Sequence, residues 1–237
     1  MMRRGFDDAR RWTELGTELV RSATAGWGEP EMSAPSGLPG WTRKHLIAHL
    51  AANADALGNL VHWAATGERT PMYSSPEQRA ADIEAGAQRP AHELTVWLRE
   101  SAERLAAAMA SLDERQWRTE VVTAQGRTVP ATEVPWMRAR EVCVHAVDLA
   151  ANVGFSDLPA DFLTALADDV VVKRGAKPGT AVALTATDTG ETWRLPGDGT
   201  PVEVGGSLAD VTAYLTGRPH AVATTDGSPA PDLAAWL

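Results

Sequence analysis

Residues 135–152 read PWMRAREVCVHAVDLAAN, and this stretch predicts both a helix and a site on that helix. Proline at its start suits the first turn of a helix. Glu141 and His145 are four residues apart, so one helix face carries both side chains, one above the other. Cys143 lies about 200° around the same helix from Glu141 and therefore points to the opposite side. A free cysteine in that position usually packs as a small hydrophobic residue, so we exclude Cys143 as a ligand or nucleophile.

A second predicted helix, over 42–67, supplies the partner for this face. Thr42 suits an N-cap and Gly67 a left-handed residue at the C-terminus. His49 borders the apolar stripe of this helix, whereas His45 lies further toward solvent. Two imidazoles and one carboxylate from facing helices would make a three-ligand zinc site whose open fourth position is typical of catalytic zinc. The simpler alternative is that each histidine is an ordinary core or surface residue.

Two further helices complete the predicted architecture of the first part of the chain. One begins after Asp7 and Asp8 and carries Trp12 at helical spacing with other apolar residues, and the next begins at Pro90. With long connections at 68–89 and 113–133, these four helices predict a four-helix bundle with a site in its core.

The pattern changes after Gly154. We expect one more helix over 160–173 and a short helix between Ser207 and Gly217. Alternating residues separated by turn signals predict strands at 180–187, 191–195, 201–204 and 221–225. The fold class is therefore mainly α, with a bundle over 1–154 and a small α+β domain over 155–237.

Composition limits the possible partners. The 237-residue chain has a formal net charge of −9, which opposes any general grip on nucleic-acid phosphates. A mean hydropathy of −0.21 and the lack of a long uncharged apolar run argue against a membrane span. The charged start, Met1 to Arg11, shows no secretory signal, and a single cysteine suits a reducing cytoplasm. We expect a cytoplasmic protein that is a monomer or a weak homo-oligomer.

Four charged residues are further candidates for the site. Asp148 shares the face of His145, where it would hold the imidazole ring or act as a replaceable fourth ligand, or else pair with Arg138 or another base. Arg79, in the long loop after the first ligand helix, and Arg138 are candidates for substrate binding. Arg218 follows Gly217 at a helix end, where a guanidinium could clamp a carboxylate. Arg79 and Arg218 could each simply be a surface charge, and without a comparison to a family this alternative is favoured.

Several segments then suggest a family. They are GWTRKHLIAH at 40–49, PMY at 71–73, TAQGRTVP at 123–130, WMR at 136–138, HAVDL at 145–149, GSLA at 206–209 and the Gly217-Arg218 step. Together they resemble the mycothiol-dependent maleylpyruvate isomerases of actinobacteria over nearly the whole chain. The helix motifs alone indicate only the broader DinB-like superfamily of metal-binding bundles, whereas TAQGRTVP and WMR are more specific.

This resemblance implies a chemistry. It implies zinc bound by His49, Glu141 and His145, mycothiol as the thiol cofactor, and an arginine in the second domain that falls on Arg218. The implied reaction converts maleylpyruvate to fumarylpyruvate in gentisate-type aromatic degradation, by reversible addition of a zinc-bound thiolate to the C=C bond. Pro219 departs from the smaller, more flexible residue that we expect after the Gly-Arg step, which puts the shape of this loop in doubt.

Three other functions remain possible from the sequence. A mycothiol-dependent thiol transferase would use the same metal and thiol but release the adduct. A non-enzymatic metal-binding module would have a closed site with Asp148 as the fourth ligand. A zinc hydrolase would need only zinc and water.

Overall fold

The computed structural model describes residues 4–175, 179–233 and 236. The chain divides into two compact units: one consists of residues 5–153, and the other joins the first four residues to the chain from Gly154 onward. Within the described residues, no helix has both the length and the apolar character needed to cross a membrane.

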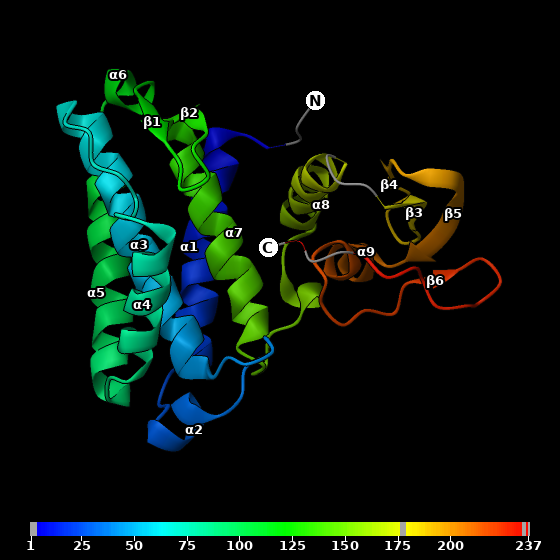
Figure 1. Ribbon diagram of the computed structural model, residues 1–237, viewed down its shortest axis with the longest axis horizontal. Coiled ribbons are helices and arrows are strands. Elements are labelled where there is room, and N and C mark those ends of the chain that lie inside the picture. The colour runs from blue at the N-terminus through cyan, green and yellow to red at the C-terminus, as the bar shows by residue number, and fades with distance from the viewer. Residues whose placement is uncertain (1–3, 176–178, 234–235, 237) are drawn as a thin grey trace. The chain divides into compact units, whose positions relative to one another are not determined.

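Four long helices build the first unit (Figure 1). They are α1 (Phe6–Ala23), α3 (Arg43–Thr66), α5 (Ala91–Ala110) and α7 (Val134–Asp148). Helix α1 packs along α7, and α5 packs along α3; the two pairs then meet where α3 contacts α7. This arrangement confirms the predicted helical bundle.

A glycine sets the close approach of α1 and α7. A Cβ atom at Gly16 would lie 2.5 Å from Cγ2 of Val142 and 2.6 Å from Sγ of Cys143, which no real side chain tolerates. The Trp12 and Trp136 rings also meet edge to face, with their centroids 5.8 Å apart. Both tryptophans are buried, so α7 is held firmly against α1.

Helix α3 begins and ends as the sequence predicts. Thr42 is the N-cap, and its backbone N–H donates to Nδ1 of His45 at 3.2 Å. Gly67 ends the helix with a φ of 79°, in the left-handed region where glycine has no steric penalty. Leu46 and Leu50 lie among the fully buried residues of its apolar face.

Helix α7 ends at Asp148, four residues before the predicted end at Asn152, and the carbonyl groups at and just after its end accept hydrogen bonds from other segments. The N–H of Gly37 donates to the carbonyl of Asp148 at 2.7 Å. The guanidinium of Arg43 donates to the carbonyls of Leu149 and Ala150, at 2.8 and 2.7 Å. Arg43 is the first residue of α3, so it fixes the start of one ligand-bearing helix to the end of the other.

Both long connections contain structure that the sequence analysis did not predict. The connection 68–89 contains α4 (Pro76–Ala87), which buries only three residues and therefore lacks a strong apolar period. The connection 113–133 contains α6 (Glu114–Trp117), an antiparallel hairpin of β1 (Glu120–Val122) and β2 (Thr128–Pro130), and the 3₁₀ turn η1 (Ala131–Glu133). A short helix, α2 (Glu29–Ser33), also lies between α1 and α3.

In its described residues, the second unit consists of a four-stranded sheet and two helices. A 3₁₀ turn, η2 (Phe155–Asp157), leads into α8 (Ala160–Arg174), and α9 (Leu208–Leu215) is capped by the Ser207 side chain. The strand order is β4-β3-β5-β6, with β3 and β5 parallel and the outer pairs antiparallel. The strands are β3 (Thr180–Ala186), β4 (Thr192–Leu195), β5 (Asp198–Gly206) and β6 (Ala223–Thr224). Compared with the prediction, β5 is longer and β6 shorter.

Candidate metal centre

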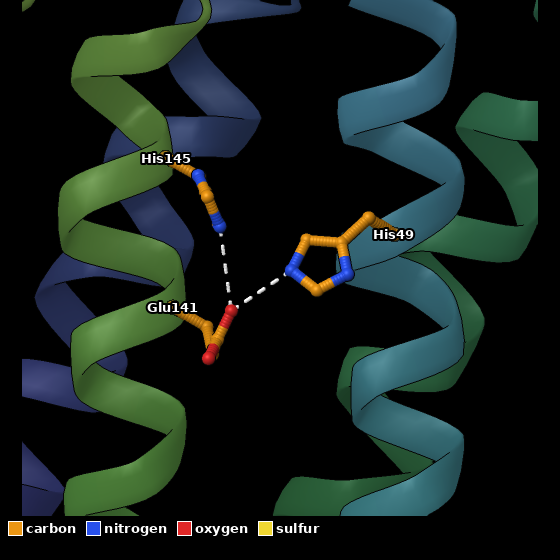
Figure 2. Close-up of side chains that lie close together, drawn as sticks. All are labelled: His49, Glu141 and His145. Atoms are coloured by element: carbon orange, nitrogen blue, oxygen red, sulfur yellow. Dashed lines mark hydrogen bonds and ion pairs between the residues drawn. The ribbon is translucent and has the colours of Figure 1, made fainter. Parts of the chain in front are cut away.

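Three side chains converge between α3 and α7 (Figure 2). His49 extends from α3, while Glu141 and His145 extend from successive turns of α7. Oε2 of Glu141 lies 2.9 Å from Nε2 of His49 and 3.4 Å from Nε2 of His145. All three ligand atoms lie within 4.8 Å of one another, and no other such group of metal-binding side chains occurs in the part of the chain that the structure describes.

These separations suit a tetrahedral metal ion. Ligand atoms about 2.0–2.1 Å from zinc in tetrahedral geometry lie roughly 3.3 Å from each other. The two separations from Glu141 bracket that value. His49 is 3% exposed, so its ring is already held in a dry environment. The residues therefore fit a zinc ion with two imidazoles and one carboxylate.

Asp148 binds the ring nitrogen of His145 that points away from the other two candidate ligands. Its Oδ2 lies 2.8 Å from Nδ1 of His145, and the carboxylate is 2% exposed. Burial opposes a charge on His145, but hydrogen bonds with Asp148 and Glu141 raise its pKa to about 9. The carboxylate accepts from Nδ1, which leaves Nε2 turned toward Glu141 and His49. Of the predicted alternatives for Asp148, this contact matches the one in which it orients the ring.

Glu141 and His49 have pKa values shifted downward. Burial alone would raise the pKa of Glu141, but hydrogen bonds and charges from His145 and His49 hold it well below its ordinary range. Burial lowers the pKa of His49, partly offset by its hydrogen bond with Glu141. Without metal, the site is therefore an ionised carboxylate between a protonated His145 and a neutral His49.

Two other side chains, Arg79 and Trp41, contact His49, and a third, Tyr73, packs against Arg79. Arg79 lies in α4, not in the loop predicted there, and its Nη2 is 3.4 Å from Nδ1 of His49. The Trp41 ring lies edge-on to His49, with centroids 5.7 Å apart. The Tyr73 ring lies 5.7 Å below the guanidinium carbon of Arg79. Trp41 and Tyr73 occur in family-like segments, which was the only signal in the sequence that could have identified them.

Arg138 is buried between helices. Its side chain is 1% exposed, and Nη1 donates to the carbonyl of Leu50 at 2.7 Å and to Oδ1 of Asn53 at 2.9 Å. It makes no ion pair with Asp148, which was one interpretation of that residue; Asp148 pairs with His145 instead. Arg138 thus ties α7 to α3 beside the candidate metal ligands.

Cys143 and Arg218 lie in different environments. Cys143 is fully buried against α1, its Sγ 3.5 Å from the carbonyl of Trp12, and burial raises its pKa to about 12. Its thiol therefore remains protonated and faces away from the three candidate ligands.

Arg218 follows α9 in the second unit, after Gly217 with a φ of 71°. Its Nη1 donates to the carbonyl of Thr216, and its guanidinium lies 5.7 Å from the Trp236 ring centroid.

The fold and the site define a class: a helical bundle in which two histidines and one carboxylate, from two of its helices, could hold a metal ion. Comparison with known proteins defines the family. Residues 13–150 match the family model described as the mycothiol maleylpyruvate isomerase N-terminal domain, and the chain belongs to this family.

Solved structures agree with this assignment. A crystal structure described as the mycothiol-dependent maleylpyruvate isomerase is 38% identical, covers 98% of both chains and superposes with a TM-score of 0.93. A structure of a histidine-to-alanine mutant of that enzyme gives the same identity, coverage and score. A search of curated proteins gave no match.

Proposed function

We propose that this protein is a zinc- and mycothiol-dependent maleylpyruvate isomerase that forms fumarylpyruvate. The single observation that carries the proposal is the convergence of His49, Glu141 and His145 in a chain that is 38% identical to such an isomerase over 98% of its length. The two-histidine, one-carboxylate donor set suits zinc and leaves a fourth position open.

The reaction requires that a C=C bond rotate, so the double bond must be lost for a moment. Zinc-bound mycothiol, when present, supplies a thiolate that can add to this bond and leave again. The chain's own part begins with His49, Glu141 and His145, which hold the metal. Asp148 accepts from Nδ1 of His145 and thereby keeps Nε2 as the ligand atom.

Arg79 has the position and the chemistry to hold a substrate carboxylate. The Glu141 carboxylate accepts the proton on Nε2 of His49, so Nδ1 is free to accept from Arg79 in the absence of metal. A metal on Nε2 leaves the ring proton on Nδ1, to which Arg79 can no longer donate. The guanidinium is then available for a carboxylate beside the metal.

Arg218 completes the proposal from the second domain, 155–237. The family resemblance implies that an arginine in this domain is needed for activity, and Arg218 matches it; a guanidinium can stabilise negative charge that develops on the substrate as the thiolate adds. Within its own unit, Arg218 lies at the turn after α9, where its Nη1 donates to the carbonyl of Thr216.

One assay tests this function. Maleylpyruvate isomerisation is measured with and without mycothiol, using zinc-loaded and chelator-treated protein. We expect turnover only when zinc and mycothiol are both present, with no net loss of free thiol. Progressive loss of thiol would instead identify a thiol transferase, and thiol-independent consumption of substrate would identify a hydrolase. Metal binding without turnover on any of these substrates would leave a non-enzymatic module.

A further inference from the structure

The bundle is open along one side. Helix α1 packs on α7 and α5 packs on α3, but α1 and α5 hardly touch. A cavity of about 1020 Å³ lies between α1 and α5, entirely within the unit of residues 5–153. This volume is at the upper end of the range for sites that bind small molecules.

The walls of this cavity are apolar and its edges are charged. Val20, Leu98, Leu105, Met109 and Val142 are among the residues that line it. Leucine, valine and methionine side chains around a space of this size favour an apolar occupant over water. Charged side chains of both signs line the cavity at exposed positions: Glu14, Glu18, Arg21 and Arg99.

One buried cation also lines the cavity, namely Arg138 from α7. Two hydrogen bonds from its Nη1 to α3 hold the guanidinium in place. Among the described residues, no carboxylate lies within 4 Å of it, and neither Nε nor Nη2 has a hydrogen-bond acceptor. Burial lowers its pKa to about 10, partly offset by the more distant charge of Glu141, so it remains charged at neutral pH. Because no anion contacts the guanidinium directly, a bound carboxylate would stabilise this buried charge.

We propose that this cavity binds an apolar molecule that carries a single carboxylate, with the carboxylate paired to Nε and Nη2 of Arg138. These two nitrogens form the side of the guanidinium that makes two parallel hydrogen bonds to a carboxylate. Because Nη1 is already fixed on Leu50 and Asn53, little side-chain freedom is lost when the anion binds. The apolar body then lies between α1 and α5. This ligand site does not depend on the proposed isomerase reaction.

The test compares two probes of equal chain length, decanoate and decan-1-ol, by calorimetric titration of the full-length, zinc-loaded protein. We expect about one decanoate per chain and at least tenfold weaker binding of the alcohol, which lacks the charge. Arg138→Lys should lower decanoate affinity, because an ammonium group keeps the charge but cannot make the two parallel hydrogen bonds to the carboxylate. Ala102→Trp, which fills the cavity from α5, should lower decanoate affinity at least tenfold. Ala107→Trp is the matched control, because Ala107 is exposed on the same helix and does not line the cavity.

Four outcomes would overturn the proposal. They are absence of decanoate binding, equal affinity for the acid and the alcohol, wild-type decanoate binding by Ala102→Trp, and decanoate affinity unchanged in Arg138→Lys. In the last case, a raised KM for maleylpyruvate would show that Arg138 serves a substrate on the metal side instead. A change in sedimentation of Ala102→Trp without loss of decanoate binding would mark the cavity as an interface between copies. If Arg138→Lys does not fold, the proposal is still tested by the titrations of the wild type with the two probes and by decanoate binding to Ala102→Trp.

Discussion

Nε2 of His49 lies 2.9 Å from Oε2 of Glu141, although 92 residues separate them in the sequence. Helix α3 supplies one side of this contact and α7 the other. Arg43 fixes the start of α3 to the carbonyls that directly follow α7, and Gly16 allows α1 to pack closely against α7. The contact therefore depends on the packing of three helices.

Removal of any one of the three candidate ligands should abolish tight zinc binding. His49→Ala, Glu141→Ala and His145→Ala each leave two protein ligands, too few for a catalytic zinc site. Metal analysis after dialysis should give about one zinc per chain for the wild type and far less for each variant. His45→Ala is the matched control: it lies one turn before His49 and bonds to Thr42 and Glu84 instead. Full zinc content in all three ligand variants would disprove the site.

Zinc binding should release about one proton per metal at pH 7 to 8, and zinc affinity should rise with pH up to about 9. The cause is His145, whose pKa of about 9 keeps it protonated in the metal-free protein, whereas His49 is already neutral. The stability of the metal-free protein should change with pH in the opposite direction, falling as the pH rises. The pKa is raised in the folded state, so this contribution is complete below about pH 6.5 and is lost as the pH rises through 9.

Titration calorimetry in two buffers of different ionisation enthalpy measures this proton release. Asp148→Asn removes a main cause of the raised pKa and should reduce the release. A pH-independent zinc affinity in the wild type between pH 6.5 and 9 would contradict the assignment of His145 as the protonated ligand.

Arg218→Ala should keep zinc and fold while turnover falls on the order of 100-fold, because a positioned cation for developing negative charge is lost. Arg218→Lys should recover only part of the activity, since an ammonium group cannot make the planar two-point contact. Steady-state kinetics at saturating mycothiol measure both. Arg194→Ala, at an exposed position of β4 in the same unit, is the control and should behave as wild type. Normal kcat/KM in Arg218→Ala would leave the second unit a structural role.

Gly16→Ala should destabilise the bundle by about 2 kcal/mol. The added methyl collides with Val142 and with both the side chain and the backbone of Cys143. This overpacking costs up to about 3 kcal/mol, against roughly 1 kcal/mol gained in helix propensity. Gly58→Ala in α3 is the matched control, because nothing lies within 4 Å of its added Cβ. It should instead stabilise by roughly 0.5–1 kcal/mol in urea denaturation. Equal effects of the two substitutions would show that α1 and α7 are not in close contact.

The sequence by itself determined the bundle helices and which residues share a face. Side chains four residues apart lie one above the other on any α-helix, so Glu141 and His145 were paired before any tertiary contact was known. Thr42 and Gly67 marked the ends of α3 because capping depends on local backbone geometry. Helix geometry likewise places Cys143 on the opposite side of α7 from Glu141, which excluded it as a ligand or nucleophile.

Only the tertiary structure decided which groups meet across helices. Arg79 reaches His49 because α4 folds onto α3, and α4 has too few buried residues to show a helical apolar pattern. The early end of α7 depends on Gly37 and Arg43, which donate to it from distant parts of the chain. Arg138 shares a helix with Glu141, but its bonds to α3 and its place in the cavity between α1 and α5 depend on how the helices pack. Local periodicity fixes directions around one helix axis, whereas distances between helices depend on packing of side chains remote in sequence.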